Sequence, residues 1–106
     1  MDSCIFCDVV AGKLPSTKLY EDDDVVVIAD IHPQAPVHWL VISKKHVPEL
    51  LEVPDGLAGS MMTVVNKIIR DQGIGNYRIV INGKGAVLVD HLHIHVLGSI
   101  DKFRTL

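Results

Sequence analysis

The stretch His91-Leu92-His93-Ile94-His95-Val96-Leu97 alternates imidazole and aliphatic side chains without a break. Successive side chains of a β-strand point to opposite faces, so a strand here would place three histidines on one face and the aliphatic residues on the other, towards a core. A helix would scatter the histidines around its circumference, and the β-branched Ile94 and Val96 favour extended backbone. The stretch therefore predicts a strand with one apolar face and one face of imidazoles.

Three uses of the histidine face are open. One is a solvated strand that is merely rich in histidine, although three buried histidines without partners would be costly. Another is a metal ion bound by all three, but a strand rise of about 3.3 Å per residue separates the Cα atoms of His91 and His95 by about 13 Å. Metal–nitrogen bonds are only about 2.0–2.1 Å long, so two neighbours share an ion more easily than three do. The geometry favours a division of labour: one histidine for a structural partner, one for chemistry and one for the substrate.

A histidine without a metal is a nucleophile at neutral pH, because its ordinary pKa is about 6.5. The bond that it forms with phosphorus is reactive, so a histidine nucleophile suits phosphoryl or nucleotidyl transfer better than acyl transfer. Just before the histidines, Asn82-Gly83-Lys84-Gly85 offers an amide, backbone N–H groups and a cation to a phosphate. The alternative interpretation of this segment is a plain glycine turn between two strands.

The rest of the chain predicts an α+β fold. We expect helices over residues 4–12 and from Pro54-Asp55-Gly56 to Gly73, and strands over Lys18–Tyr20, Val25–Ala29, Val37–Ser43, Tyr77–Asn82 and Leu92–Leu97. This order predicts a single domain, residues 1–106, with a five-stranded, mainly antiparallel sheet, one short helix and one long helix. Open sheet edges favour pairing in a dimer.

Composition and charge exclude several classes of protein. The 106 residues are 48% hydrophobic and 22% charged, with a net charge of −3, a globular balance that argues against disorder. Scattered Lys and Arg argue against nucleic acid or an anionic membrane as partner. No apolar run approaches the roughly 20 residues of a membrane-spanning helix, and Met1-Asp2-Ser3-Cys4 lacks the pattern of a signal peptide. We therefore expect a cytoplasmic protein.

The two cysteines, Cys4 and Cys7, form one Cys-x-x-Cys step. In a cytoplasmic chain this spacing suggests metal binding or redox work more than a structural disulfide. A thioredoxin-type motif would follow a strand, and nothing strand-like precedes Cys4. From the residues alone, a pair of metal ligands and a pair of small buried hydrophobic residues are equally open.

The histidine stretch resembles the signature of the histidine triad (HIT) family, in which three histidines alternate with apolar residues. Three further blocks resemble the family in the family's order: Cys4-Ile5-Phe6-Cys7, Asp30-Ile31-His32-Pro33-Gln34-Ala35-Pro36-Val37-His38 and Val41-Ile42-Ser43-Lys44-Lys45-His46. The Pro-Gln-Ala-Pro-x-His part is similar to the nucleoside phosphoramidase branch, the histidine triad nucleotide-binding proteins. The resemblance implies a HIT-like fold and a homodimer formed through the sheet and the long helix.

The resemblance also implies an activity: a purine nucleotide-binding hydrolase that cleaves nucleoside 5′-phosphoramidates and releases a nucleoside monophosphate. His93 matches the nucleophile that carries the covalent nucleotidyl intermediate, His95 the residue that contacts the phosphate and the leaving group, and His38 a histidine near the triad. Asp30 matches the carboxylate that holds the ribose hydroxyls. The nucleotide-binding residues implied in this way are Ile5, Phe6, Asp30, Ile31, Asn82, His93 and His95.

In family members with an N-terminal Cys-x-x-Cys, and in the related galactose-1-phosphate uridylyltransferases, two cysteines and two histidines hold zinc. The matching positions in this chain are Cys4, Cys7, His46 and His91. Four protein ligands would make the Zn²⁺ structural, with no open coordination position. The alternative is a site that holds no metal.

The segment Ala86-Val87-Leu88-Val89-Asp90 departs from the family's usual Gly-Gln-Ser-Val-x before the triad. Leu88 stands where the family has a hydroxyl beside the phosphate and the departing amine. Losing one such hydrogen bond can cost roughly 10²–10³ in rate, unless Lys84 substitutes for it. This departure leaves a low-turnover nucleotide-binding module as an alternative. A dinucleoside polyphosphate hydrolase and an enzyme that uses zinc directly in catalysis are further alternatives.

Overall fold

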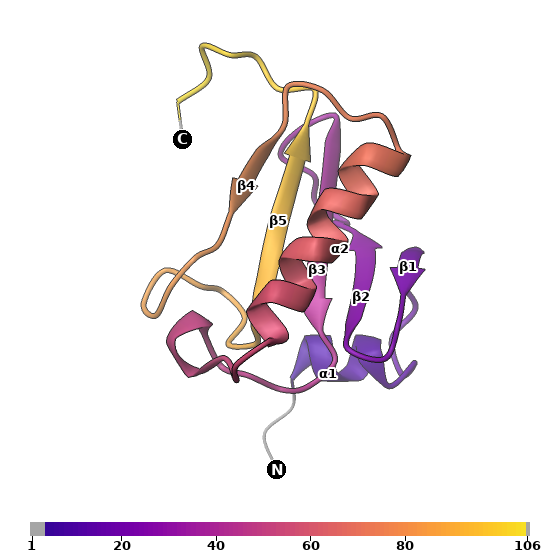
Figure 1. Ribbon diagram of the computed structural model, residues 1–106, viewed down its shortest axis with the longest axis vertical. Coiled ribbons are helices and arrows are strands. Elements are labelled where there is room, and N and C mark those ends of the chain that lie inside the picture. The colour runs from indigo at the N-terminus through magenta and orange to yellow at the C-terminus, as the bar shows by residue number, and fades with distance from the viewer. Residues whose placement is uncertain (1–3, 106) are drawn as a thin grey trace.

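The aliphatic runs of the chain become the strands of one sheet in the computed structural model, which describes residues 4–105 (Figure 1). The strands are β1 (Lys18–Glu21), β2 (Val25–Ala29), β3 (Val37–Ser43), β4 (Arg78–Val80) and β5 (His93–Gly98), in the order β1-β2-β3-β5-β4 with every neighbouring pair antiparallel. The helices are α1 (Ile5–Val10), a short 3-10 helix (Leu50–Glu52) and α2 (Leu57–Asp71). Residues 1–3, which the sequence analysis used to argue against a signal peptide, lie outside the described range. Within that range no helix is long and apolar enough to cross a membrane.

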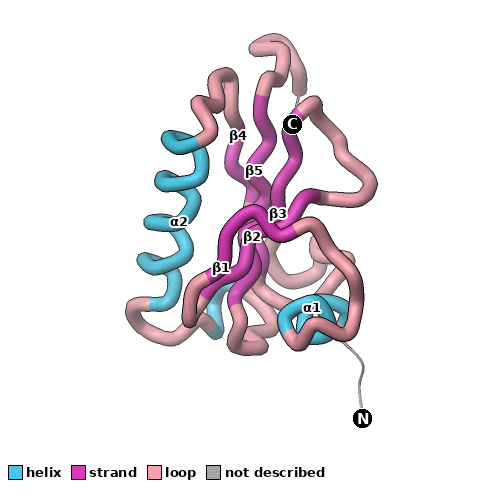
Figure 2. The backbone as a smooth tube through the Cα atoms, turned by 90° about the vertical axis from the view of Figure 1, so that its right-hand side faces the viewer, coloured by secondary structure: helices cyan, strands magenta, loops and turns pink. Residues whose placement is uncertain are grey.

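The two α-helices lie on opposite faces of the sheet (Figure 2). The long helix α2 buries one side of its surface against one face, and the short helix α1 covers part of the other near the end of the sheet where β5 begins (Figures 1 and 2). Alternate residues of the interior strands divide between the two faces, as the period of two requires. The α2 face holds Val25, Val27, Val41, Leu92, Ile94 and Val96, and the α1 face holds Val26, Ile28, Leu40 and Ile42.

The predicted architecture is confirmed: a five-stranded antiparallel sheet, one short helix and one long helix. Three strand predictions are wrong at their ends. The strand predicted over Lys18–Tyr20 runs one residue further, to Glu21, which pairs with Val26. The strand predicted over Tyr77–Asn82 is limited to Arg78–Val80, the residues that pair with β5, and Asn76 just before it turns the chain with a φ of 47°. The strand predicted from Leu92 begins at His93, so His91 lies just ahead of β5.

The register of the central strands gathers the polar residues of the α1 face. Ile42 of β3 lies opposite His93 of β5, and Leu40 lies opposite His95. His38 is two residues before Leu40 on the same face, so it lies diagonally across from His95. Asp30 follows β2, and its N–H donates to the carbonyl of His38 at 2.9 Å. The antiparallel pairing thus brings residues 30, 38, 93 and 95 into one neighbourhood.

Gly98 marks a close approach that a side chain would disrupt. A Cβ at this position would lie 2.6 Å from Cγ2 of Ile74 and 2.9 Å from Cβ of Val37, its partner across the sheet. We expect Gly98→Ala to lower the free energy of unfolding by about 1–3 kcal/mol, measured by urea denaturation.

The matched control for Gly98→Ala is Gly59→Ala. Gly59 is an exposed residue of α2 whose Cβ would meet nothing within 4 Å. An alanine in a helix is favoured over glycine, so this variant gains about 0.5–1 kcal/mol. Equal effects of the two substitutions would contradict the close packing at Gly98.

Candidate functional site

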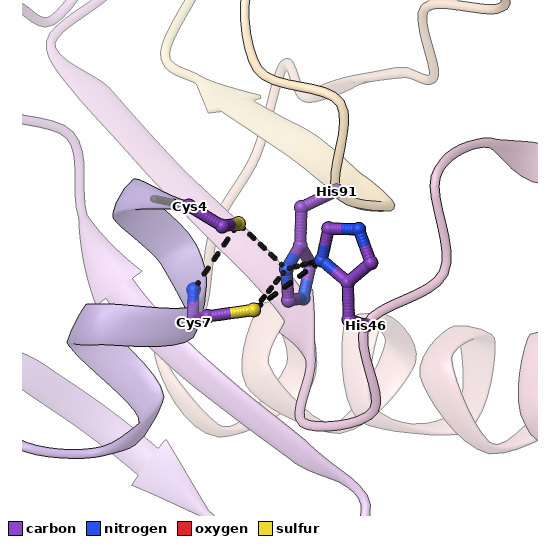
Figure 3. Close-up of side chains that lie close together, drawn as sticks. All are labelled: Cys4, Cys7, His46 and His91. Carbon is purple, nitrogen blue, oxygen red and sulfur yellow. Dashed lines mark hydrogen bonds between the residues drawn. The ribbon is translucent and has the colours of Figure 1, made fainter. Parts of the chain in front are cut away.

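Two cysteines and two histidines from three separate segments converge beside α1 (Figure 3). Cys4 and Cys7 come from the start of α1, His46 from the segment after β3, and His91 from the segment before β5. Their ligand atoms, the two Sγ atoms and one ring nitrogen of each histidine, all lie within 4.8 Å of one another. The structure therefore brings together all four residues predicted as zinc ligands.

The spacing of these atoms suits a tetrahedral ion. Nδ1 of His91 lies 3.3 Å from Sγ of Cys4, 3.5 Å from Sγ of Cys7 and 3.2 Å from Nδ1 of His46, which itself lies 3.3 Å from Sγ of Cys7. Zinc bonds of about 2.3 Å to sulfur and about 2.0–2.1 Å to nitrogen imply tetrahedron edges of about 3.5–3.6 Å between S and N and about 3.3–3.4 Å between the nitrogens. The donor set and its geometry thus fit Zn²⁺.

Groups beside His91 and Cys7 influence where these two candidate ligands carry their protons. The carbonyl of Ser43 lies 2.6 Å from Nε2 of the fully buried His91. A carbonyl can only accept, so Nε2 carries the proton and the lone pair of Nδ1 faces the thiols. Burial is the main cause that lowers the pKa of His91, and the charges of His46 and His93 lower it further. The hydrogen bond to the Ser43 carbonyl raises this pKa but does not outweigh burial, so the ring stays neutral. Burial and the adjacent Cys4 raise the pKa of Cys7, so a bound cation would displace protons from the thiols.

His93 is oriented by the backbone of the residue two positions before it. The carbonyl of His91 lies 2.7 Å from Nδ1 of His93, so Nδ1 carries the proton and donates it. Nε2 of His93 is therefore left with a free lone pair. Phe6 of α1 packs edge-on against both rings, with ring centroids 4.9 Å from His93 and 6.0 Å from His91. The segment of α1 and its N-cap thus supplies two members of the Cys/His cluster and the wall behind His93.

His38 and His95 form a chain of hydrogen bonds whose direction is set by the backbone. The N–H of Gln34 donates to Nδ1 of His38 at 3.0 Å, so the proton of the neutral His38 ring sits on Nε2. That Nε2–H points at Nδ1 of His95, 2.9 Å away. His95 is consequently an acceptor at Nδ1 and carries its own proton on Nε2. The rings of His95 and His93 are neighbours, with centroids 5.0 Å apart.

Burial keeps both members of this histidine pair neutral. It is the largest cause that lowers the pKa of His95, to about 4, and the nearby His93 and His38 add to it, opposed by Asp30. Burial likewise lowers the pKa of His38, and so does the positive charge of Arg104, while Asp30 opposes them. Oδ2 of Asp30 lies 3.4 Å from Nε2 of His38, and its Oδ1 accepts the N–H of His32 at 2.7 Å.

Asp30, His38 and His95 offer three ligand atoms close together, so they form a second candidate metal group by distance alone. The hydrogen bonds argue against this use. Because the Gln34 N–H occupies Nδ1 of His38, the neutral ring keeps a proton on the Nε2 that would have to bind the ion. The group is better suited to moving a proton than to holding a cation.

The remaining predicted residues lie at the margins of this region. Ile31 is 84% exposed and Ile5 is 56% exposed, so neither is covered by the protein itself. Asn82 is half-buried and lies two residues beyond Val80, which pairs with His95. Fully exposed Leu88 lines an open hollow of about 900 Å³ together with Ile5, Cys4 and Cys7. This hollow borders the metal cluster rather than His93.

Sequence analysis missed Ser43 and Gln34. Both act through backbone groups, the Ser43 carbonyl on His91 and the Gln34 N–H on His38. Every residue other than proline has these groups, so no residue type signals them. Gln34 does lie inside the Pro-Gln-Ala-Pro block, and that position was the one available hint.

Known proteins are similar to this chain in sequence and in fold. The family model described as HIT domain matches residues 11–101 of the chain. Protein HitA from Neisseria gonorrhoeae is 40% identical over 105 residues, which cover 93% of this chain and 98% of that protein. A solved structure of a HIT family hydrolase from Legionella pneumophila Philadelphia 1 matches with a TM-score of 0.87 at 34% identity, covering 93% of this chain and 95% of the other.

A further solved structure bears on the metal cluster. It is a Zn-bound histidine triad family protein from Mycobacterium smegmatis, with a TM-score of 0.86 and 32% identity, and the match covers 96% of this chain and 78% of the other. In this chain the Cys and His side chains form a group that suits metal binding.

The cluster predicts a stabilising metal. We expect Zn²⁺ at about 100 times its dissociation constant to stabilise the wild type by about 2.7 kcal/mol, because the folded chain alone presents all four ligands. Thermal unfolding with zinc and after chelation measures this gain. Cys7→Ser removes one ligand and should melt near the metal-free wild type in both conditions.

A gain of equal size in Cys7→Ser, or none in the wild type, would contradict this role of the cluster. Activity measured on the same samples separates two uses of the metal. Immediate loss of activity on chelation, before any loss of stability, would favour zinc acting directly in catalysis over a structural ion.

Proposed function

The chain belongs to the HIT domain family, and from that premise we propose that it hydrolyses purine nucleoside 5′-phosphoramidates through a covalent nucleotidyl intermediate on His93. The observation that carries the proposal is the hydrogen-bond pattern of two neighbouring rings, from which the proton positions in their neutral forms follow. His93 has a free lone pair on Nε2, and His95 has a proton on Nε2. A nucleophile and a proton donor therefore lie side by side.

The proposed nucleotide site extends from these rings to the loop after β2. Asp30 has two carboxylate oxygens at the edge of the site, and a carboxylate can accept both hydroxyls of a ribose. Phe6 presents an aromatic wall, and the exposed side chains of Ile5 and Ile31 are available to cover a base. Asn82 is the proposed amide on the phosphate side.

In the first chemical step, Nε2 of His93 attacks the α-phosphorus, a P–N bond to His93 forms, and the P–N bond to the leaving amine breaks. The amine needs a proton. The pair can supply it by relay: the proton on Nε2 of His38 passes to Nδ1 of His95 as His95 releases its own, and a solvent proton replaces it on His38. His95 then delivers the proton from Nε2 to the amine as general acid.

In the second step, water attacks the same phosphorus. The new P–O bond forms as the bond to His93 breaks, and the nucleoside monophosphate leaves. A proton from water returns to Nε2 of His95, the relay to His38 reverses, and His38 releases one proton to solvent, which restores the neutral pair. His93 regains its lone pair because its other nitrogen stays bonded to the His91 carbonyl throughout.

The segment before β5 offers no hydroxyl group that could share the protonation of the leaving amine with His95. Residues 86–90 contain no hydroxyl side chain, and Leu88 points into solvent. Residues 86–90 therefore offer no group to protonate the leaving amine, and in the proposed mechanism His95 does so without their help. The same feature favours the second candidate function, a nucleotide-binding module with little turnover.

In this proposal Zn²⁺ is structural and is held by Cys4, Cys7, His46 and His91. Bound there, the ion would supply a coordination crosslink between α1, the segment after β3 and the segment before β5. It takes no part in the chemical steps. In the chain itself, the carbonyl of His91 accepts a hydrogen bond from Nδ1 of His93 and so orients the ring of His93.

We further propose a cytoplasmic homodimer of this single-domain chain. The short strand β4 is an edge of the sheet, and an unpaired edge favours association. Tyr77, just before β4, is 54% exposed, and Met62 of α2 is 38% exposed. A dimer formed through the sheet and α2 would cover apolar surface of this kind.

The nucleophile is tested with His93→Ala. Steady-state hydrolysis of adenosine 5′-phosphoramidate should fall by at least about 10³, because no other group can form the covalent intermediate. Binding of adenosine monophosphate and the melting temperature check that the site and the fold persist. Turnover that survives in the variant would rule out the covalent mechanism, and tight binding without turnover in the wild type would favour the binding module.

The proton donor is tested with His95→Gln and two leaving groups. Hydrolysis of adenosine 5′-phosphoramidate should fall by roughly 10²–10⁴, since the amine leaves only when protonated. Hydrolysis of the p-nitrophenyl ester of adenosine monophosphate should fall far less, because the phenolate is a stable anion.

His32→Gln is the matched control for His95→Gln. His32 is an exposed histidine whose contacts at the site are made by its backbone. We expect it to leave both rates unchanged. Equal losses for the two substrates in His95→Gln would assign His95 a role other than proton donation.

A further inference from the structure

The segment after β5 folds back onto the loop that carries Gln34. Nη1 of Arg104 donates to the carbonyl of Gln34 at 2.8 Å. The backbone of Arg104 is itself held, since its carbonyl accepts from Nη1 of Arg78 at 3.3 Å and its N–H donates to the carbonyl of Asp101 at 2.9 Å. An exposed residue of the tail is thereby fixed to the loop between β2 and β3.

Gln34 is held on three sides. Its carbonyl accepts from Arg104, its side-chain Nε2 donates to the carbonyl of His32 at 3.1 Å, and its N–H donates to Nδ1 of His38 at 3.0 Å. The last of these bonds determines which nitrogen of His38 carries the proton. Whatever fixes Gln34 therefore also fixes the direction in which His38 donates.

We propose that Arg104 is a positioning residue for the histidine pair: by holding Gln34, it keeps Nδ1 of His38 an acceptor and directs the His38 proton to His95. The inference deepens the proposed function and rests on it only for the effect on rate. Arg104 lies beyond residues 11–101, the part of the chain that matches the HIT domain. The device thus belongs to this chain's own tail.

Charge acts in the same direction as the hydrogen bond. The charged or titratable groups that face His38 are Asp30 after β2, His95 on β5 and Arg104 in the tail. The carboxylate of Asp30 attracts a second proton to His38, and the guanidinium of Arg104 repels it. With Arg104 present, burial and this repulsion together keep the pKa of His38 below its ordinary value.

The test replaces the guanidinium and reads the rings of the histidines directly. In Arg104→Gln, we expect NMR of ¹⁵N-labelled histidine to show that His38 takes up its second proton at a higher pH than in wild type. We also expect its ¹⁵N shifts to move towards a mixture of tautomers. Arg104→Lys restores the positive charge and should return the titration towards wild type.

The matched control is Lys102→Gln, which removes one positive charge from the same tail. The ammonium of Lys102 lies over the ring of Phe103, 5.2 Å from its centroid, and is not among the charges that shift the pKa of His38. We expect it to leave the His38 spectrum unchanged. Arg104 is exposed, so the melting temperatures of all variants should agree.

The effect on rate is a second readout. If wild type hydrolyses adenosine 5′-phosphoramidate, Arg104→Gln should lower kcat about tenfold with little change in KM, because a mixture of His38 tautomers directs fewer protons to His95. A His38 spectrum and titration identical to wild type in Arg104→Gln would overturn the proposal, as would an equal change in Lys102→Gln. A wild type without turnover would count against the proposed function, and the NMR result would still decide the role of Arg104.

Discussion

The fully buried imidazole of His91 is the constraint on which the rest of the site depends. Its Nε2 donates to the Ser43 carbonyl, which forces its other nitrogen towards Cys4 and Cys7. Its own carbonyl accepts from His93 and leaves that ring with one free lone pair. A single residue ahead of β5 thus couples the candidate metal cluster to the proposed nucleophile. Loss of either contact would leave a buried polar group unpaired, which is costly, and this cost holds the arrangement in place.

Backbone partners give chemically identical side chains different roles. His93 donates from Nδ1 to a carbonyl and presents a lone pair, whereas His95 accepts at Nδ1 from another ring and presents a proton. The two residues are neighbours on one face of one strand, and both belong to the same alternating pattern. What separates them is the group that meets Nδ1: the carbonyl of His91 in one case and the protonated nitrogen of His38 in the other.

The loop between β2 and β3 joins the substrate side of the site to its proton chemistry. Asp30 at its start faces His38, and Gln34 in its middle sets the proton of the same ring. Arg104 reaches this loop from the far end of the sequence, so the tail and the loop share one hydrogen-bond network. The segment of residues 86–90, in contrast, offers the site no hydroxyl. At this site the positions of the protons are therefore set by the histidines and by the backbone groups that bond to them.

The sequence by itself determined the fold class, and the family resemblance predicted the residues that the fold brings together. Alternation with a period of two identified the strand of histidines and its buried face, because this pattern depends on side-chain type and spacing. The Cys-x-x-Cys step alone left metal binding open, and the set Cys4, Cys7, His46 and His91 came from the resemblance to the HIT family. Tertiary structure decided which nitrogen of each histidine carries a proton, that His91 lies ahead of β5, and that Arg104 reaches Gln34. These features are set by backbone carbonyl groups, by N–H groups that every residue type except proline has, and by contacts between segments up to 70 residues apart. Backbone hydrogen bonds leave no mark on the order of side chains, so only the folded chain reveals them.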